Sequence, residues 1–554
     1  MSFYDDASLV FLPSGQAGKD GKAYSMKPTN GDGDFTFSRG SNLAATRVGA
    51  DGLIEKGREN LLKQSNAFST SPWSSGLSGG TIVTGQTGYD GSSDAWLMTT
   101  QGTNGYLSQS ISQSGVQTFS IYAKAGDAEY LLLRAYEDST TFAYYHLTGA
   151  GSVTLTSGDI ETKITRINGG DWYRCTLTYT GGLTLVRVYM AGNNTTAVNV
   201  GDNIYIQDAQ LEIGLVPTEY IESGATKGKA GLLEQEPRFD YSGGASCASL
   251  LLEGSRTNEI GYSEYFEGWT PQGSPTITTN YGTSPEGLQN SSRLVFTSVS
   301  DYIETSVTNT SGVFTLYAKG TGNLILTDSG ANASSTTALT SSYQRIELYF
   351  STNTTTLQIK TDSSGLDAEV YAAQFENATY PTSYIPNHSG GSVTRDADVC
   401  EGAGTSSTFN AGEGVFYAEI STNTDDTDKA ISLNNGVSGS LNNRLWMGYS
   451  TSNKRIYALG YVNNSLQFAL SKLMTDESLF VKIACRYKRN DIAFFVNGEK
   501  VGTDTTALNF TELSSLDFNI GTAVSGASPF YGNVKEVLVF NSYLSDSEIN
   551  TLTS

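Results

Sequence analysis

The sequence predicts an all-β protein made of tandem antiparallel β-sandwiches, jelly-roll-like at first and of a different pattern at the carboxyl end. Glycine (60), tyrosine (32) and phenylalanine (23) are abundant, whereas charged residues make up only 16%. This composition fits pleated, half-buried strands joined by tight turns. Short strand-like runs recur along the chain, and one stretch occurs twice. Because 554 residues exceed what one hydrophobic core holds, we expect several domains.

The duplicated stretch combines a Gln-apolar-Glu triplet, four free residues and Pro-Thr-x-Tyr-Ile. It occurs at 210–221 and again, 164 residues later, at 374–385. Proline fixes φ and lacks an N–H group, which suits a strand that must stop pairing. We therefore predict a structural clasp at the last strand of each unit, with its glutamates accepting hydrogen bonds from the adjoining backbone. Its residues are Gln210, Glu212, Pro217 and Tyr220 in the first copy, and Gln374, Glu376, Pro381 and Tyr384 in the second.

Residues 1–57 form a glycine-rich arm with too few apolar side chains to enclose a core of its own. We expect the arm to pack on later domains or on a neighbouring subunit. The first sandwich is predicted at 58–222, where the run 118–124 alternates and turns Phe119, Ile121 and Ala123 inward.

The second sandwich is predicted at 256–387, because its motifs follow those of the first in the same order. The spacing between matched motifs falls from 198 to 164 residues, which places deletions in the loops of the second copy. Between the two sandwiches, a connector at 223–255 carries Gly-Leu-Leu-Glu, an echo of Gly-Leu-Ile-Glu at 52–55. The connector is therefore expected to pack with the arm, which would make the first sandwich an insertion.

A linker is expected at 388–408, followed by a third sandwich at 409–554. In this third domain, Asn497-Gly498 between two apolar runs predicts a tight hairpin. Ser545 followed three residues later by Glu548 predicts the capped start of one short terminal helix.

Two sets of motifs resemble known families. "FFVNGEKVG" with "FYGNVKEVLVFNSYLSDSEINTL" resembles laminin-G-like, or concanavalin A-like, sandwiches. "DFTFSRGS", "PRFDYSGG", "LLLEGSRTN", "SVTRDADVC" and the closing motif resemble tailed-bacteriophage virion proteins of the fibre or spike type with tandem, carbohydrate-binding-module-like jelly rolls. The chain departs from that order by placing a whole sandwich between Glu55 and Leu232. The resemblance implies an oligomeric virion surface protein: a head or tail fibre, a spike or a decoration protein.

The net charge of −22 argues against nucleic acid and against anionic membrane surfaces as partners. The acidic start Met1–Asp6 lacks the pattern of a signal peptide, and no apolar run is long enough to span a membrane. We therefore expect a protein made in the host cytoplasm and located on the virion surface. Its expected partners are other virion proteins, reached through the arm, and further copies of itself, with a trimer favoured.

The sequence favours a binding protein over an enzyme, because it shows no nucleophile or phosphate-loop motif. We predict no catalytic residue and no cofactor. A glycosidase would need paired carboxylates, and candidates could be drawn from Asp425, Asp426 and Asp428, or from Glu512 and Asp517. The first three carboxylates are alternatively hard ligands for Ca²⁺.

Sugar recognition needs aromatic rings beside amide groups, and the third domain offers such a set. The predicted glycan-binding residues are Trp446, Tyr449, Tyr457, Tyr461, Asn463 and Asn464. Alternation places Trp446 and Tyr449 on opposite faces of one strand. The leading hypothesis is adhesion to host-surface or environmental glycans, and the alternatives are a structural spacer without ligand and a polysaccharide depolymerase.

Overall fold

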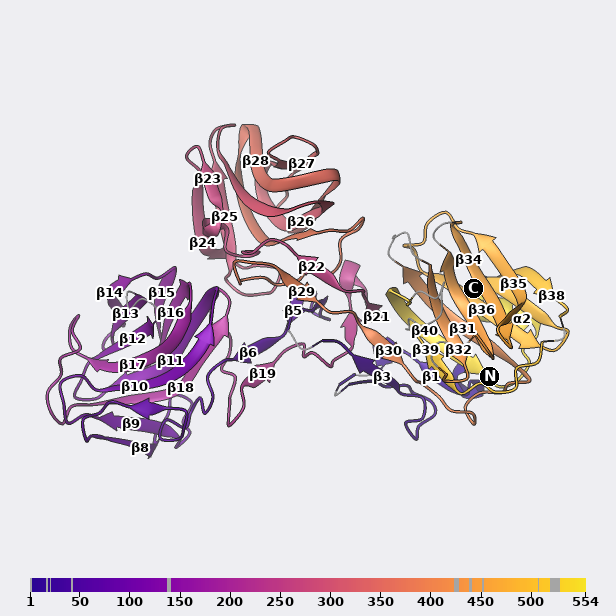
Figure 1. Ribbon diagram of the computed structural model, residues 1–554. Helices are drawn as coiled ribbons and strands as arrows, with labels where there is room; N and C mark the ends of the chain where they lie inside the picture. Colours follow the sequence, from indigo (N-terminus) through magenta and orange to yellow (C-terminus); the bar gives the residue numbers. More distant parts are fainter. Residues whose placement is uncertain are drawn as a thin grey trace.

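The computed structural model describes all residues except 1, 16–17, 20, 41–42, 137–140, 423–427, 438–440, 451–452, 507 and 519–528. Three β-rich lobes surround a narrow centre, and both chain ends lie at the same lobe (Figure 1). Almost every ordered element is a strand, so the predicted all-β class is confirmed.

The first lobe is a sandwich of two sheets with six strands each. One sheet runs in the order β14-β13-β12-β17-β10-β7 and the other in the order β15-β16-β11-β18-β9-β8. Phe119, Ile121 and Ala123 are fully buried between the sheets, as the alternation predicts. The strands are β7 (Ser74–Ser75), β8 (Thr81–Gln86), β9 (Ala95–Thr99), β10 (Tyr106–Gln113), β11 (Val116–Ala125), β12 (Tyr130–Tyr136), β13 (Thr141–His146), β14 (Ser152–Ser157), β15 (Glu161–Arg166), β16 (Trp172–Thr180), β17 (Leu183–Ala191) and β18 (Asn203–Ile213).

The second lobe has the same plan, but two of its strands run through both layers. β26 (Tyr302–Asp328) and β28 (Gln344–Glu376) pair with each other on both sides of a bend near Gly320 and Gly322, which have positive φ. Such angles suit glycine because it has no Cβ. The turns that separate strands in the first sandwich are shortened here, so the strands continue. The remaining elements are β23 (Thr270–Gln272), β24 (Thr276–Gly282), β25 (Ser291–Phe296), β27 (Ser334–Ala338) and the 3-10 turn η3 (Phe266–Gly268).

The third lobe is a sandwich of an eight-stranded and a five-stranded sheet. The Asn497-Gly498 hairpin is confirmed, since both residues have positive φ between β37 and β38. The terminal helix α2 (Asp546–Thr553) is also confirmed, with its capping box in place. The strands are β31 (Glu413–Thr422), β32 (Lys429–Asn434), β33 (Arg444–Ser450), β34 (Arg455–Val462), β35 (Ser465–Leu473), β36 (Val481–Lys488), β37 (Ile492–Val496), β38 (Glu499–Asp504), β39 (Ser515–Asp517) and β40 (Gly532–Phe540).

The arm and the connector complete this third lobe. β1 (Leu9–Phe11) and β21 (Ser249–Leu252) both pair with β40, and β20 (Arg238–Asp240) extends the sheet. Phe11 and Phe35 lie in the same core as the third sandwich. Residues 409–554 therefore share one core with segments from the other end of the chain.

Short ladders cross the centre of the molecule (Figure 1). Residues 388–408, expected to be a linker, contribute two strands to these ladders: one pairs with the arm, where Cys400 joins the core of the third lobe, and the other pairs with residues 256–258. The pairs are β2 (Lys22–Ala23) with β3 (Phe35–Ser38) and β30 (Val399–Glu401), β4 (Thr46–Val48) with β5 (Ile54–Lys56), β6 (Arg58–Asn60) with β19 (Gly228–Ala230), and β22 (Arg256–Asn258) with β29 (Val393–Arg395). Short helical turns are α1 (Phe3–Asp6), η1 (Pro13–Gly15) and η2 (Ser242–Gly244).

A buried ionic network ties these ladders together. The Arg238 guanidinium, which is fully buried, forms ion pairs with Glu253 and Asp398. Arg395 pairs with Glu253 at 2.8 Å, and Arg39 pairs with Asp398 at 3.0 Å. Burial alone would raise the pKa of Glu253, but the charges of Arg395 and Arg238 outweigh it and hold that pKa well below its usual range. Removing one partner of such a network typically costs about 3–5 kcal/mol.

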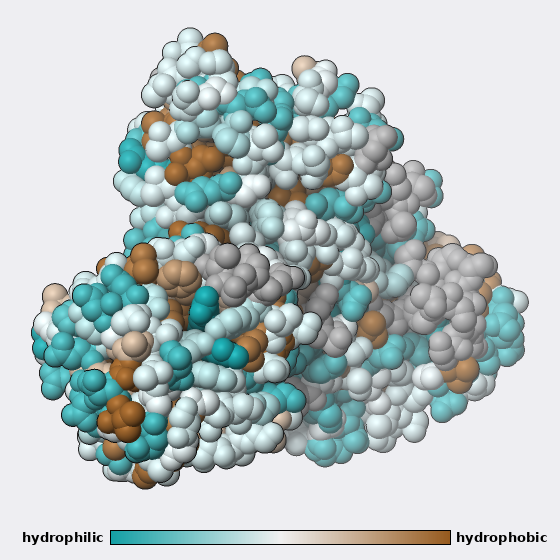
Figure 2. All heavy atoms as spheres, turned by 60° about the vertical axis from the view of Figure 1, so that its left-hand side comes forward, coloured by the Kyte–Doolittle hydropathy of each residue, from teal (hydrophilic) through white to brown (hydrophobic). Residues whose placement is uncertain are grey.

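The visible surface is mostly hydrophilic or of intermediate hydropathy, with hydrophobic residues in separate small patches (Figure 2). In the part of the chain that the structure describes, no helix is long and apolar enough to cross a membrane.

Candidate functional site

The first sandwich carries large aromatic side chains on the outer face of one of its sheets. In the sheet β14-β13-β12-β17-β10-β7, alternate residues such as Leu107, Leu133 and Val188 point inward and are fully buried. The residues between them point outward. We call this outer surface the aromatic face; its residues are Tyr106, Tyr130, Leu132, Arg134, Tyr136, Phe142, Tyr144, Arg187 and Tyr189.

Strand register arranges these side chains in two rows. Tyr144 pairs with Leu132, Leu132 with Tyr189, and Tyr189 with Tyr106, which gives an apolar row across four strands. Neighbouring strands lie about 4.8 Å apart, so this row is about 14 Å long. The next row contains Phe142, Arg134, Arg187 and Ser108 in the same strand order.

Arg187 is held in place by tyrosines of the aromatic face. Its Nη1 donates hydrogen bonds to the hydroxyl of Tyr189 at 2.8 Å and to that of Tyr136 at 3.2 Å. Its guanidinium lies 4.2 Å from the ring centre of Tyr106 and 4.7 Å from that of Tyr136. Burial alone would lower the pKa of Arg187, but the hydrogen bond to Tyr189 and the neighbouring phenols raise it. The arginine therefore remains charged and has a fixed orientation.

The centre of the aromatic face is sheltered, while its rim is open. Leu132, Tyr189 and Tyr144 are only 1%, 4% and 8% exposed although they lie on the outer side of the sheet. Tyr106 and Phe142 are half-buried and border them. Aromatic side chains that combine a broad apolar ring with a polar tip suit ligands that are partly apolar and partly hydroxylated.

The second sandwich has the same register but a different outer face. Tyr302 pairs with Lys360, which pairs with Ile325, and Glu304 pairs with Gln358, which pairs with Thr327. The positions of Tyr189 and Arg187 are thus taken by Lys360 and Gln358. Gln358 Nε2 donates to Glu304 at 2.7 Å, so this face satisfies its own polar groups. Of these two sandwiches, only the first has an aromatic face among its described residues.

Sequence reasoning missed the aromatic face, although the signal is present in the sequence. Tyr130 to Tyr136, Phe142 to His146 and Leu185 to Tyr189 alternate between apolar core residues and equally large residues on the other side. A half-solvated sheet normally carries small polar residues on that side. Aromatic rings and arginines at outward positions are therefore the sequence signal of the aromatic face.

The predicted glycan-binding residues of the third lobe fall into three environments. Trp446, Tyr457 and Tyr461 gather on the outer side of β33 and β34, and the rings of Trp446 and Tyr461 lie 5.2 Å apart. Trp446 and Tyr457 are only 6% and 9% exposed, so they do not present the open rings expected from the sequence. Tyr449 is 2% exposed and lies in the main core, since Met447 and Tyr449 point toward the opposing sheet.

The amides of Asn463 and Asn464 help to build the turn between β34 and β35. Both residues have positive φ. Asn464 Oδ1 accepts a hydrogen bond from the Leu441 amide at 3.1 Å, and the Asn463 amide donates to Asn442 at 2.7 Å. Their contacts in the structure are therefore those of a turn.

The acidic candidates do not form a described site. Asp425 and Asp426 lie outside the described residues, and Asp428 is half-buried at the start of β32. Asp517 accepts hydrogen bonds from the Gly402 amide and from Asn434, whereas Glu512 is exposed. Within the described residues no group of three His, Cys, Asp or Glu side chains is arranged to hold a metal ion.

The duplicated clasp forms the same hydrogen bonds in both sandwiches. Glu376 accepts from the Thr382 amide at 2.8 Å, and Gln374 Oε1 accepts from the Ile385 amide at 2.6 Å. In the first copy Glu212 accepts from the Thr218 amide at 2.9 Å, and Gln210 accepts from Ile221 at 2.6 Å. The prolines precede these turns, Pro217 and Pro381 each lying just before the threonine. These contacts are structural, because each acceptor lies on the last strand of its sandwich and each donor lies in the segment that follows it.

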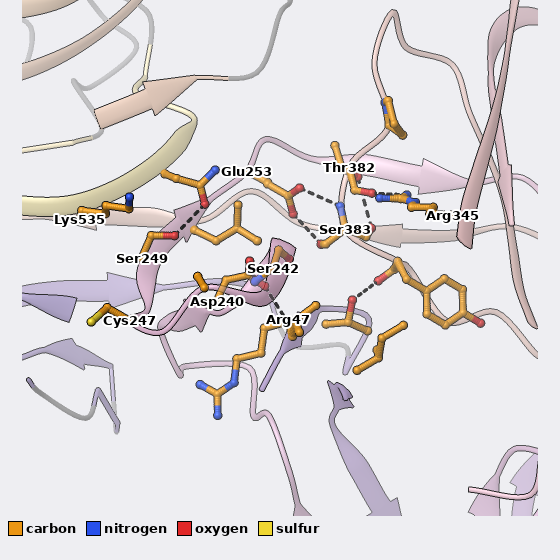
Figure 3. A pocket seen from close by; sticks show the side chains of 18 of the residues that line it. Arg47, Asp240, Ser242, Cys247, Ser249, Glu253, Arg345, Thr382, Ser383 and Lys535 are labelled. Carbon is orange, nitrogen blue, oxygen red and sulfur yellow. Dashed lines mark hydrogen bonds between the residues drawn. The ribbon is translucent and has the colours of Figure 1, made fainter. Parts of the chain in front are cut away.

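A polar cleft of about 300 Å³ lies at the junction of the arm, the connector, the second sandwich and the third lobe (Figure 3). Its polar groups largely pair with one another: Ser383 donates to Glu253, Arg345 to the Thr382 carbonyl, and Ser249 to Asn533. The cleft therefore joins modules, and its chemistry is that of an internal seam.

One region of the chain matches the profile of a known group of proteins. Residues 415–550 match the profile of the concanavalin A-like lectin/glucanases superfamily, which confirms the predicted class of the third sandwich. No curated protein matches the chain.

The solved structures that align with this chain cover about a quarter of it. The Ruminococcus gnavus IT-sialidase CBM40 bound to alpha2,3 sialyllactose is 17% identical over 26% of this chain and 84% of that chain, with a TM-score of 0.23. A leech intramolecular trans-sialidase is 18% identical over 26% and 23%, with a TM-score of 0.23. A heptameric SAP-like pentraxin from Limulus polyphemus is 12% identical over 26% and 70%, with a TM-score of 0.22.

Proposed function

We propose that this protein is a non-catalytic bacteriophage virion surface protein that adheres to glycans through the aromatic face of its first sandwich. One observation carries the binding role: the apolar row from Tyr144 to Tyr106 lies directly beside a row that contains Arg134 and Arg187. Rings that stack on the C–H faces of sugars need neighbouring donors for the hydroxyl groups, and this face supplies both. The virion role is supported by the sequence motifs that resemble fibre and spike proteins.

The proposed binding site lies on the first sandwich, whereas the sequence predicted one on the third lobe. Tyr449 fills a core, and Trp446 and Tyr457 are about as deeply covered as the centre of the aromatic face. The first sandwich differs in the row of Arg134 and Arg187, which lies beside the half-buried rings of Tyr106 and Phe142.

The chain is further proposed to assemble as a homo-oligomer, with a trimer favoured, and to join other virion proteins near its arm. Tyr4 and Met26 of the arm are 44% and 43% exposed, and such side chains are suited to contacts with a partner. Light scattering of the purified chain measures the oligomer. A monomer at micromolar concentration would contradict this part of the proposal.

The binding role is tested with the full chain on an array of bacterial capsular and exopolysaccharides. Tyr106→Ala should weaken binding at least tenfold, because it removes one end of the apolar row. The matched control is Tyr302→Ala at the same register position of the second sandwich, which should leave binding unchanged. Absence of binding to every polysaccharide would favour the alternative of a structural spacer, and release of reducing ends would favour a depolymerase.

A further inference from the structure

We propose that the aromatic face selects glycans that carry carboxylate groups, such as polyuronic acids, and that Arg187 is the residue that contacts the carboxylate. This inference rests on the proposed glycan-binding function and names the ligand class of the same face.

The first argument is the placement of two like charges. Arg134 and Arg187 are direct partners in the register of β12 and β17. Like charges directly opposite one another destabilise a sheet. At the same two positions the second sandwich has the neutral residues Thr327 and Gln358, so the fold itself does not require a cation pair. A bound anion is a reason to keep the pair.

The second argument is the sign of the local charge. The chain carries 56 acidic against 34 basic residues. Among the described outward residues of β10, β12, β13, β14 and β17, however, none is Asp or Glu. An acidic polymer would therefore be repelled by most of the molecule and attracted to this face.

The Arg187 guanidinium has hydrogen-bonding capacity that the protein itself does not use. Its Nη1 is engaged by the hydroxyls of Tyr136 and Tyr189. Its Nη2 takes part in no hydrogen bond within the described residues and, unlike Nε, is not fully buried. A carboxylate at this edge supplies an acceptor for the guanidinium, which donates hydrogen bonds from a planar fork of N–H groups. Phosphate shares this chemistry, so a phosphate-bearing polymer serves as a comparison arm of the test.

The fourth argument is the distance between the rows. Neighbouring rows are about 7 Å apart along the strands, so one sugar can stack on the half-buried ring of Tyr106 while its carboxylate reaches Arg187 in the next row. A charge attached directly to the sugar ring fits this spacing.

The experiment compares binding of the full chain to polygalacturonate, alginate and hyaluronan with binding to the carboxyl-reduced form of each, and to a glycerol-phosphate teichoic acid. The wild type should bind at least one polyuronate at least tenfold more tightly than its reduced form and more tightly than the teichoic acid. Arg187→Lys keeps the charge but loses the fork, so it should lose at least tenfold in that affinity and clearly less in the affinity for the reduced polymer. The control Lys360→Gln removes a cation from the second sandwich and should have no effect.

Each outcome decides between the two claims. Equal, Tyr106-dependent binding to the carboxylated and reduced polymers would overturn the selectivity and leave the glycan-binding face standing. Preference for the teichoic acid would replace carboxylate by phosphate as the ligand group. Binding to none of these polymers, or binding that Tyr106→Ala does not weaken, would overturn both the selectivity and the proposed site. Near-ultraviolet circular dichroism of each variant confirms that its tertiary packing is intact.

Discussion

The first and second sandwiches share their closing contacts almost atom for atom and differ on the sheet surface between them. In each, a buried glutamate accepts from a threonine amide while a glutamine carbonyl accepts from an isoleucine amide. Asn60 and Asn258, at the start of each copy, also donate to the backbone of the last strand, to Ala209 and Ala373 respectively. Across the outer sheet, by contrast, Tyr189 and Arg187 are replaced by Lys360 and Gln358.

This difference separates what the fold requires from what a ligand requires. The clasp satisfies backbone groups that would otherwise be buried without partners, so both copies keep it. The outer sheet positions carry no such constraint, and the two copies differ there.

The junctions of the two sandwiches differ as well. Glu264 of the second sandwich is fully buried and accepts hydrogen bonds from Lys56 and Tyr384, both at 2.8 Å. The equivalent position of the first sandwich is Asn66, which is only half-buried. The second sandwich is thereby fixed to the arm. The first is joined to the centre through the β6–β19 ladder and contacts the second through Asn280, which donates to Glu161 and to the Leu215 carbonyl.

The largest expected effect comes from breaking the shared clasp. Glu376→Ala should lower the unfolding free energy of the second sandwich by about 3 kcal/mol, because the Thr382 amide and hydroxyl lose a charged acceptor. Glu212→Ala should cost the first sandwich a similar amount. Segment-resolved hydrogen exchange measures each sandwich separately. A clearly unequal cost would show that the two clasps are not equivalent.

The second largest expected effect comes from giving the outer face of the first sandwich the residues of the second. Replacing Arg187 by Gln and Tyr189 by Lys gives the first sandwich the residues of the second, and should weaken polysaccharide binding about 100-fold, or about 2.7 kcal/mol. Biolayer interferometry on the full chain provides the measurement. The matched control is Gln358→Glu on the second sandwich, which should leave the affinity within twofold of wild type; retained affinity in the double variant would place the ligand elsewhere.

Lowering the pH should change the stability of the two sandwiches in opposite directions. Burial, together with the nearby Asp94 and Asp90, raises the pKa of Asp208 in the first sandwich to about 7, above its ordinary value of 3.8. The folded state then binds the extra proton, so this group's contribution to stability rises as the pH falls from 7 toward 4.

Glu264 of the second sandwich behaves in the opposite way. Burial alone would raise its pKa, but the charge of Lys56 and its hydrogen bonds hold that pKa well below 4.5. Its contribution is complete above about pH 4.5 and is lost as the pH falls through the folded pKa. Hydrogen exchange between pH 7 and 3 should therefore show protection increasing around 207–224 and decreasing around 260–270. Parallel slopes in the two regions would be inconsistent with these assignments.

The smallest expected effect concerns the clasp tyrosines. Tyr384→Phe removes a hydroxyl that donates to the buried Glu264 and should cost about 1–2 kcal/mol. Tyr220→Phe in the first sandwich, where the hydroxyl is 2.5 Å from the Ser65 Oγ and the ring is only half-buried, should cost less. Thermal unfolding followed by hydrogen exchange ranks the two, and a larger cost for Tyr220→Phe would reverse the comparison of the junctions.

Much of the fold was readable because its signals are local. The clasp repeats within twelve residues, the Asn497-Gly498 turn is a two-residue signal, and the cap of α2 spans Ser545 to Glu548. The pairing of Leu9–Phe11 with Val537–Val539 joins opposite ends of the chain, and neither segment carries a sequence signal that identifies its partner strand. For the same reason, the arm was expected to pack on a later domain or a neighbouring subunit without the third lobe being singled out, and residues 388–408 were expected to be only a linker.

The candidate site depended on which side of each strand faces the core. Alternation placed Trp446 and Tyr449 on opposite faces, but only the opposing sheet decides that Tyr449 points inward. In the first sandwich, both sides of β12 and β13 carry large residues, so the sequence does not separate core from surface. The register among β13, β12, β17 and β10 brings the outward residues into one face.

The location of the binding face is tested most directly by hydroxyl-radical footprinting of the full chain with and without a bound polyuronate. Oxidation of Tyr106, Tyr136 and Phe142 should fall on binding. Oxidation of Tyr281 and Tyr349, which are 45% and 50% exposed on the second sandwich, should stay constant. Protection of Tyr461 or of the second sandwich, with unchanged oxidation of the first, would contradict the assignment of ligand binding to the aromatic face.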